Sequence, residues 1–278
     1  MNDCAPSCLG DAFATLAASQ CEVILNALNN ANDRHRSVHQ ARKAIRGLRS
    51  LLALVVDAFG ADIAPIDRAL KKLATSLSPL RDAHVVVATA EKLATGDEAP
   101  LWHAVVLTLE ARRENLLLQA LAKDPAFARR RANVLAISNA IDKLPWGQHK
   151  FKAVIRHGLE RSERRIAKAE EDARRARSPA SVHRWRRRVR RLRLQFEALQ
   201  RLDDLTSQAS QPMVHRHKAI KALSHLTDQL GWNQDLRVLR LLLNKLTDAS
   251  VTPVIPALRK RLRHEIRIAG QKYRSSNT

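Results

Sequence analysis

Residues 37–49 read SVHQARKAIRGLR, and residues 181–193 read SVHRWRRRVRRLR. In both copies apolar residues recur every three or four positions, which is the spacing of one face of an α-helix. These residues are Val38, Ala41, Ile45, Leu48 and Leu52 in the first copy, and Val182, Trp185, Val189, Leu192 and Phe196 in the second. Each copy is therefore predicted to be a helix that buries one side in a core.

Beside the apolar face, each helix carries a row of positive charge. At about 100° per residue, the histidine and three arginines of a copy fall within about 80° of one another, and a further cation lies next to them. The first row is His39, Arg42, Arg46 and Arg49 with Lys43, and the second is His183, Arg186, Arg190 and Arg193 with Arg187. Neither row contains an acid, although like charges at this spacing repel by roughly a few tenths of a kcal/mol. We therefore expect an anion to occupy the rows.

The composition favours helices throughout. The chain has 278 residues, of which 45% are hydrophobic and 4% aromatic, with 8 glycines. Long runs rich in Ala, Leu and Arg are typical of helices. No run shows the strict alternation of apolar and polar residues that a half-buried strand needs. We predict an all-α fold with a sizeable core.

Prolines divide the chain, because a proline beyond the first turn stops or kinks a helix. The predicted helices span residues 11–30, 34–59, 63–77, 80–95, 99–122, 125–143, 147–177, 180–206, 213–230, 233–247 and 254–273.

A second correspondence indicates that the chain is duplicated. Leu70, Leu73, Leu77, Asp82 and Val85 are matched, at one constant shift, by Leu223, Leu226, Leu230, Asp235 and Val238. We predict a single domain over residues 11–273, with tails at 1–10 and 274–278. It would consist of two pseudo-twofold-related bundles, 11–143 and 147–273, of about four or more helices each, with a basic groove between them.

The net charge predicts an acidic partner. With 49 Lys and Arg against 27 Asp and Glu, the formal net charge is +22 and the pI is about 11.1. Nucleic acid, a phosphate polymer and an anionic membrane surface are the candidate partners. No segment approaches about 18 uncharged apolar residues, and no basic region precedes the first apolar stretch, so we expect a soluble cytoplasmic protein without a membrane span.

The three cysteines, Cys4, Cys8 and Cys21, lie near the N-terminus. Their spacing suits neither a metal site nor a disulfide framework, so we interpret them as unpaired thiols in a reducing cytoplasm. No metal or other cofactor is expected.

The repeated motif, Val-His-x-x-Arg-(Lys/Arg)-x-(Ile/Val)-Arg-x-Leu-Arg, resembles the hallmark of the CHAD family, the conserved histidine α-helical domain. Residues 77–85, LSPLRDAHV, resemble the family's Leu-Gly-x-x-Arg-Asp-Ala-Asp-Val segment, with Ser78 in place of Gly and His84 in place of the acid. Residues 230–236, LGWNQDL, resemble its counterpart in the second half, and residues 161–169 are similar to the basic helix before the second motif. The resemblance extends from about residue 11 to residue 273.

This resemblance implies two helical bundles around a basic channel that binds inorganic polyphosphate without catalysis. The chain lacks the Glu-x-Glu-x-Lys signature of the triphosphate tunnel domain that often precedes a CHAD domain, so it is similar to the stand-alone form. The implied role is that of a scaffold or a protein that is targeted to cytoplasmic polyphosphate granules.

Other basic residues are candidates for the same channel. Arg81 lies in the LSPLRDAHV segment, although Gln234 occupies the equivalent place in the second half. Arg161 and Arg165 share a helix face, although nearby glutamates make an ordinary ion-paired surface nearly as plausible. His39 and His183 either contact phosphate or stay neutral, bonded to a backbone group or to an acid such as Asp82 or Asp235, and these two acids are expected to orient motif arginines.

Two other functions remain open. A nucleic-acid binder shares the charge argument but should present stacking aromatics, whereas Trp102, Trp146, Trp185 and Trp232 are interpreted as core residues. An enzyme of phosphate metabolism is less favoured, because the motif histidines have no accompanying nucleophile, metal cluster or Gly-rich phosphate loop.

Overall fold

The computed structural model describes residues 6–206, 213–246 and 251–275. All regular structure in these ranges is helical, and no strand occurs within them. The prediction of an all-α fold is confirmed. Three short 3-10 helices connect the longer ones, η1 (Gly96–Glu98), η2 (Pro125–Phe127) and η3 (Trp146–Gln148).

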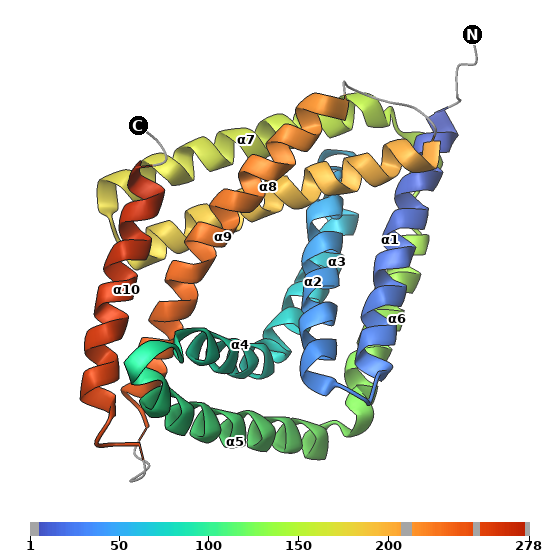
Figure 1. Cartoon of the computed structure of the whole chain (residues 1–278). Helices are drawn as coiled ribbons and strands as arrows, with labels where there is room; N and C mark the ends of the chain where they lie inside the picture. Colours follow the sequence, from blue (N-terminus) through green and yellow to red (C-terminus); the bar gives the residue numbers. More distant parts are fainter. Residues whose placement is uncertain (1–5, 207–212, 247–250, 276–278) are drawn as a thin grey trace. The chain divides into compact units, whose positions relative to one another are not determined.

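The helices, drawn in chain order in Figure 1, divide into two compact units. Unit 1 comprises Met1–Ser76 and Ala126–His225, and unit 2 comprises Leu77–Pro125 and Leu226–Thr278. Each unit thus contains segments of both predicted halves, 11–143 and 147–273. The duplication of the chain and the pseudo-twofold relation between its halves stay predictions.

Unit 1 is organised around α1 (Pro6–Asn29), which packs against α2 (Arg34–Leu52), α6 (Ala128–Asp142) and α8 (Pro179–Thr206). α3 (Val56–Ser76) packs against α2 and α6, and α7 (Phe151–Ala176) packs against α8. All five apolar positions of the first motif copy are buried, which confirms that face of the predicted helix. In the second copy Trp185, Val189 and Leu192 are buried, and the other two positions are partly exposed.

An aromatic cluster joins α1 to the start of α7. The ring centroids of Phe13 and Phe151 are 5.4 Å apart, and Phe59 meets Trp146 edge-on at 4.9 Å. Gly10 permits this packing, because a Cβ at that position would overlap the carbonyl oxygen of Trp146. Aromatic contacts of this kind contribute stability beyond the area that they bury.

The helix predicted over 34–59 is two helices, because α2 ends at Leu52 and α3 begins at Val56. Leu54 and Val55 are fully buried between them. α7 fixes this turn from outside: Arg161 donates to the carbonyl oxygen of Ala53 at 2.8 Å, and a Cβ on Gly158 would overlap the carbonyl oxygen of Leu54. α3 itself bends at Gly60, whose φ of 41° is a conformation that glycine adopts readily.

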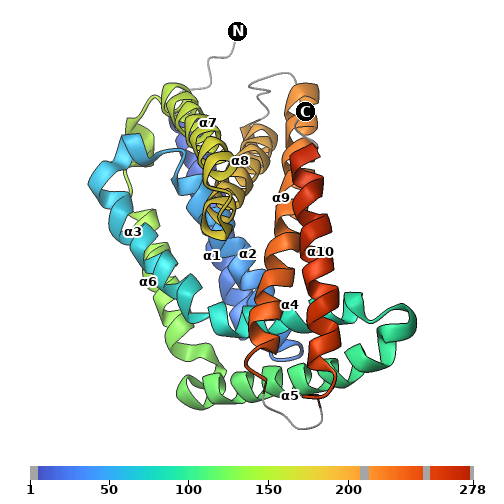
Figure 2. The same cartoon turned by 90° about the vertical axis from the view of Figure 1, so that its left-hand side faces the viewer.

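Unit 2 has its own core, built from α4 (Ser78–Leu93), α5 (Ala99–Lys123), the part of α9 (Met213–Leu243) that follows His225, and α10 (Ile255–Ser275). Figures 1 and 2 both show α4 beside α5 and α9 beside α10. Trp102 is fully buried in this core, and the side-chain amide of Asn233 donates to the carbonyl oxygen of Ile266 at 3.2 Å, which ties α9 to α10.

The separate helices predicted over 213–230 and 233–247 are one continuous helix, α9. Gly231 does not interrupt it, because a glycine costs a helix only about 1 kcal/mol and Leu230 and Leu236 are buried on either side.

At the ends of the chain, α1 begins at Pro6 and α10 reaches Ser275, so the predicted tails are shorter than 1–10 and 274–278. Their remainders, 1–5 and 276–278, lie outside the described residues.

Several side chains expected in the core are found there. Trp102, Trp146 and Trp185 are buried, whereas Trp232 is partly exposed, with the Lys92 ammonium 5.8 Å from the centre of its ring. Cys21 is an unpaired buried thiol, and burial raises its pKa to about 11. Cys4 lies outside the described residues.

Within the described ranges, no helix combines the length and the apolar character needed to cross a bilayer.

Candidate functional site

Both motif helices, α2 and α8, belong to unit 1 and pack directly against each other. The Gln195 side chain of α8 donates to the carbonyl oxygen of Ser50 in α2 at 3.3 Å, and both residues are buried. A cavity of about 420 Å³ beside this crossing is lined by Gly47 and Leu51 of α2 and by Leu194 of α8. In the repeated motif, residues 47, 50 and 51 correspond to residues 191, 194 and 195. The two helices therefore meet through equivalent turns.

The α2 row lies along α3. Asp33 caps the start of α2 by accepting a hydrogen bond from the backbone N–H of Arg36 at 2.9 Å. Further along α2, Arg42 donates to the carbonyl oxygen of Ala74, and Arg49 binds both carboxylate oxygens of Asp67, at 2.7 and 2.9 Å. Ala74 and Asp67 both belong to α3.

Exposure differs among the members of the α2 row. His39 and Lys43 are exposed, whereas Arg42, Arg46 and Arg49 are partly buried. The arginines thus have their stems packed and their charged ends oriented, while the other two side chains are open to solvent. Such partial burial is the usual behaviour of arginines that cover an apolar surface.

In the α8 row, Arg193 reaches the helix that follows, α9. Arg193 donates to the hydroxyl of Ser224 in α9 at 3.5 Å and lies 3.5 Å from the carboxylate of Glu197 on its own helix. Arg186 is buried, Arg190 and His183 are partly buried, and Arg187 is exposed. Arg42 and Arg49 of the first row and Arg193 of the second therefore reach the next helix of the chain.

His183 is surrounded by cations. Burial, followed by the charges of Arg187, Arg186 and Arg190, lowers the pKa of His183 below its ordinary value. Its ring atom Nδ1 is buried and has no hydrogen-bond partner among the described residues. In the free protein this histidine is therefore neutral near pH 7, and an approaching anion would favour its protonated form.

Two arginines that the sequence did not single out, Arg188 and Arg191, belong to the same region. Burial, then the charges of Arg49 and Arg188, lower the pKa of Arg191 to about 10, with Asp67 opposing and Arg165 adding to the effect. Burial and the charge of Arg165 likewise lower the pKa of Arg188. The signal was present as Arg184, Arg188 and Arg191 at i, i+4 and i+7. It was missed because the repeat emphasises what its copies share, and Ala44 and Gly47 occupy the positions of Arg188 and Arg191 in the first copy.

The α7 candidates have different surroundings. Arg161 pairs with Asp57 and donates to Ala53, so its contacts hold the turn between α2 and α3. Arg165 is exposed, and its charge acts on both Arg188 and Arg191. Of the two, Arg165 is the one whose charge reaches the arginines of α8.

Arg81 lies in unit 2, at the start of α4. It pairs with Asp82 at 3.0 Å, and its guanidinium lies 3.8 Å from a carboxylate oxygen of Asp235 in α9. Asp82 and Asp235 were expected to orient motif arginines, but the arginine that both contact is Arg81 of their own unit.

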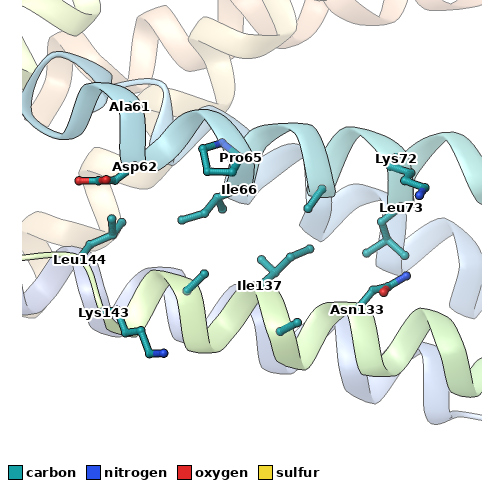
Figure 3. Close-up of a pocket in the computed structure, with 13 residues that line it drawn as sticks. Ala61, Asp62, Pro65, Ile66, Lys72, Leu73, Asn133, Ile137, Lys143 and Leu144 are labelled. Atoms are coloured by element: carbon teal, nitrogen blue, oxygen red, sulfur yellow. The ribbon is translucent and has the colours of Figure 1, made fainter.

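A cavity of about 710 Å³ lies between α3 and α6, and Figure 3 shows the side chains around it. Its lining is mostly apolar, with Ile66, Leu73 and Ile137 among the larger groups and Lys72 and Lys143 among the charged ones. No residue of either motif row contributes to this cavity. Across the described part of the chain, no group of three or more His, Cys, Asp or Glu side chains is placed to hold a metal ion.

Comparisons with known proteins agree with the helical architecture and its motifs. The crystal structure of the CHAD domain from the plant Ricinus communis is similar to this chain, with a TM-score of 0.67 and 23% sequence identity over 95% of this chain and 91% of that one. PptA from Streptomyces chartreusis is similar with a TM-score of 0.62 and 15% identity, over 95% of this chain and 98% of that one. No curated protein matches the chain in sequence. The model of the CHAD domain family matches residues 12–244, and the chain therefore belongs to the CHAD domain family.

Proposed function

We propose that this protein binds inorganic polyphosphate along its two His/Arg rows and does not turn it over. The observation that carries the proposal is the direct packing of α2 on α8 through equivalent turns. Because the two helices meet through the same part of the repeated motif, both rows run past one crossing point. This relation supports one continuous groove lined by both rows.

The chemistry of the rows suits this ligand. Polyphosphate is a flexible strand that offers only oxygen acceptors and about one charge per phosphate, so it needs many donors and no base-reading or stacking groups. Arginine supplies a planar fork that matches two phosphate oxygens at once and stays charged at any relevant pH. The proposed ligands in unit 1 are His39, Arg42, Lys43, Arg46 and Arg49 of α2, His183, Arg186, Arg187, Arg190 and Arg193 of α8, and Arg161 and Arg165 of α7. Arg81 of α4 is proposed separately as a phosphate contact of unit 2.

Family membership supports a polyanion as the partner. Among polyanions, nucleic acid is disfavoured because Trp102, Trp146 and Trp185 are buried and offer no stacking surface to bases. A competition experiment tests this preference. If single-stranded nucleic acid displaced bound polyphosphate more readily than polyphosphate displaced bound nucleic acid, a nucleic-acid-binding function would be preferred. We further propose that binding serves a scaffold or granule-targeting role in the cytoplasm.

The test is a pair of matched double variants. Arg46→Glu with Arg190→Glu should weaken binding of long-chain polyphosphate by more than about a hundredfold, since each charge-assisted hydrogen bond contributes about 1.5–3 kcal/mol. Arg164→Glu with Arg263→Glu changes the net charge equally at exposed positions of α7 and α10, and should have little effect. Circular dichroism checks that both proteins remain helical. Equal losses from the two pairs would indicate diffuse attraction and would refute the groove.

Absence of turnover is tested separately. Wild-type protein incubated with polyphosphate and Mg²⁺ should release no phosphate above the protein-free control. Release that disappears in the variants His39→Ala or His183→Ala would make the protein an enzyme.

A further inference from the structure

The cavity between α3 and α6 lies within unit 1 and is separate from both motif rows. Its volume of about 710 Å³ is in the range of small-molecule sites, roughly 300–1,000 Å³. Along α3 the lining extends from Ala61 to Leu73, which is about 18 Å at the helical rise per residue. Residues 133–144 line the other side over a similar length. The cavity is therefore long enough for an extended ligand.

The middle of the cavity is apolar. Between its two ends every lining side chain is aliphatic, and these are Pro65, Ile66 and Ala69 on α3 and Ala136, Ile137 and Ala140 on α6. Ile66 and Ile137 are buried, whereas Ala69 and Ala136 are exposed, so a ligand can reach the apolar lining from solvent. This part of the cavity suits a hydrocarbon chain.

The polar side chains of the lining lie at the two ends, as Figure 3 shows. Lys72 and Asn133 lie at one end, and Asp62 and Lys143 lie at the other. Within the described part of the chain, neither Lys72 nor Asn133 makes a side-chain hydrogen bond or an ion pair. Their ammonium and amide N–H groups can both donate to an anion. At the opposite end the carboxylate of Asp62 offsets the charge of Lys143, so an anionic group is favoured beside Lys72.

We propose that this cavity binds a long-chain carboxylate, the chemical class of the fatty acids. Its carboxylate accepts hydrogen bonds from Lys72 and Asn133, and its chain follows the apolar lining toward Leu144. An amphipathic helix of a partner protein would instead place polar side chains along both edges, where exposed alanines offer them no partners. No residue of the motif rows takes part, so the inference stands whether or not those rows bind polyphosphate.

Isothermal titration of the full chain with dodecanoate, kept below the concentration at which it forms micelles, tests the proposal. The wild type should bind one molecule per chain. Decanoate, which is shorter by two methylenes, should bind about fourfold to sixteenfold more weakly, because each methylene that leaves water strengthens binding. Equal affinities for dodecanoate and decanoate would show that the chain does not occupy an apolar site, and would overturn the proposal.

The position of the head group is tested with two lysine variants. Lys72→Gln should weaken dodecanoate binding about threefold to fivefold, the effect of an ion pair that stays open to solvent. Lys71→Gln removes the same charge at the next exposed position, which does not line the cavity, and should leave the affinity unchanged. Equal affinities of the two variants would contradict the proposed orientation of the ligand.

The position of the chain is tested by filling the cavity. Ala69→Leu with Ala136→Leu should weaken dodecanoate binding by more than about tenfold, because the added side chains occupy the apolar middle. Ala64→Leu with Ala111→Leu makes the same changes at exposed helical positions outside the cavity and should bind as the wild type does. Circular dichroism and the Tm check that both proteins are folded.

A last comparison separates this cavity from the rows of the proposed function. Arg46→Glu with Arg190→Glu should bind dodecanoate as tightly as the wild type, since neither residue lines the cavity. If this variant lost dodecanoate while Lys72→Gln and the filled cavity retained it, the carboxylate would be bound by the rows, and the proposal would be refuted.

Discussion

At the scale of single residues, the proposed role of His183 predicts that anion binding depends on pH. Burial and the neighbouring arginines lower the pKa of His183 in the free protein, so its protonated form destabilises the free fold. The free protein should therefore lose stability as the pH falls through the ordinary histidine pKa near 6.5. A bound polyanion reverses the balance of charge around the ring, so binding should take up a proton and strengthen as the pH falls.

This coupling predicts that the affinity for polyphosphate rises between pH 8 and pH 5.5, by about tenfold for each unit by which binding raises the pKa of His183. Replacing His183 with Gln should remove most of the rise, and isothermal titration in buffers of different ionisation enthalpy should show proton uptake only with the wild type. If the His183→Gln variant kept the same pH dependence, a group other than His183 would take up the proton.

Asp67 is predicted to have opposite effects on stability and on anion affinity. Burial alone would raise the pKa of Asp67, but the hydrogen bonds and charge of Arg49, with the charges of Arg191 and Lys71, bring this pKa below its ordinary value. Its stabilising contribution is therefore present at neutral pH and is lost as the pH falls through the lowered pKa. Asp67→Asn should lower the free energy of unfolding by about 1 kcal/mol, since the pair with Arg49 is partly exposed. It should strengthen polyphosphate binding, because it frees the charge of Arg49 for the ligand. Weaker polyphosphate binding in this variant would contradict the charge argument.

At the scale of helices, close packing of α7 on the turn between α2 and α3 predicts a contrast between two glycines. A Cβ on Gly158 would overlap the carbonyl oxygen of Leu54 and lie 2.9 Å from its Cα, and this backbone cannot move freely. A Cβ on Gly47 would meet only the end of the Gln20 side chain, at 3.0 Å.

Gly158→Ala should therefore destabilise the protein by about 1–3 kcal/mol in urea unfolding, as overpacking does. Gly47→Ala should be neutral or mildly stabilising, because alanine is favoured over glycine in a helix by about 1 kcal/mol. If both substitutions had the same effect, the position of α7 on this turn would be wrong.

The same turn shows what the sequence could and could not predict about helices. The apolar period predicted the buried faces of α2 and α8, because burial follows the spacing of those residues. It did not predict the break at residues 53–55, because neither proline nor glycine marks it and the turn is held by Arg161 and Gly158, about a hundred positions away. Near Gly231 the sequence predicted a break that does not exist, since burial of the neighbouring residues keeps α9 continuous.

The site was only partly predictable for a related reason. The rows of α2 and α8 follow from helix geometry and repetition. Arg188 and Arg191 depend on which face of α8 meets α2, which only tertiary packing decides.

At the scale of the whole molecule, periodicity and composition predicted the all-α class, whereas the grouping of helices into compact units required long-range contacts. Residues 77–125 pack with residues 226–278, and a sequence read in order gives no sign of that pairing. The order of the sequence also gave no sign that both motif helices lie in unit 1.

The scaffold role predicts where the protein is found in cells. A fluorescently tagged wild-type chain should concentrate on polyphosphate granules, because a granule offers many strands to each groove. The tagged double variant with Arg46→Glu and Arg190→Glu should be distributed evenly through the cell. The control variant with Arg164→Glu and Arg263→Glu should stay on the granules. If the variant with Arg46→Glu and Arg190→Glu still associated with granules, granule targeting would not depend on the His/Arg rows.

The most direct test of the central claim is the salt dependence of long-chain polyphosphate binding by the wild type and by Arg46→Gln with Arg190→Gln. Each phosphate contact on a flexible strand adds about 0.7 to the slope of log affinity against log salt. The account predicts a steep slope for the wild type, a decrease of roughly 1 to 1.5 in the double variant, and no decrease in Arg164→Gln with Arg263→Gln. A wild-type protein that does not bind at moderate salt, or an equal decrease in both variants, would contradict it.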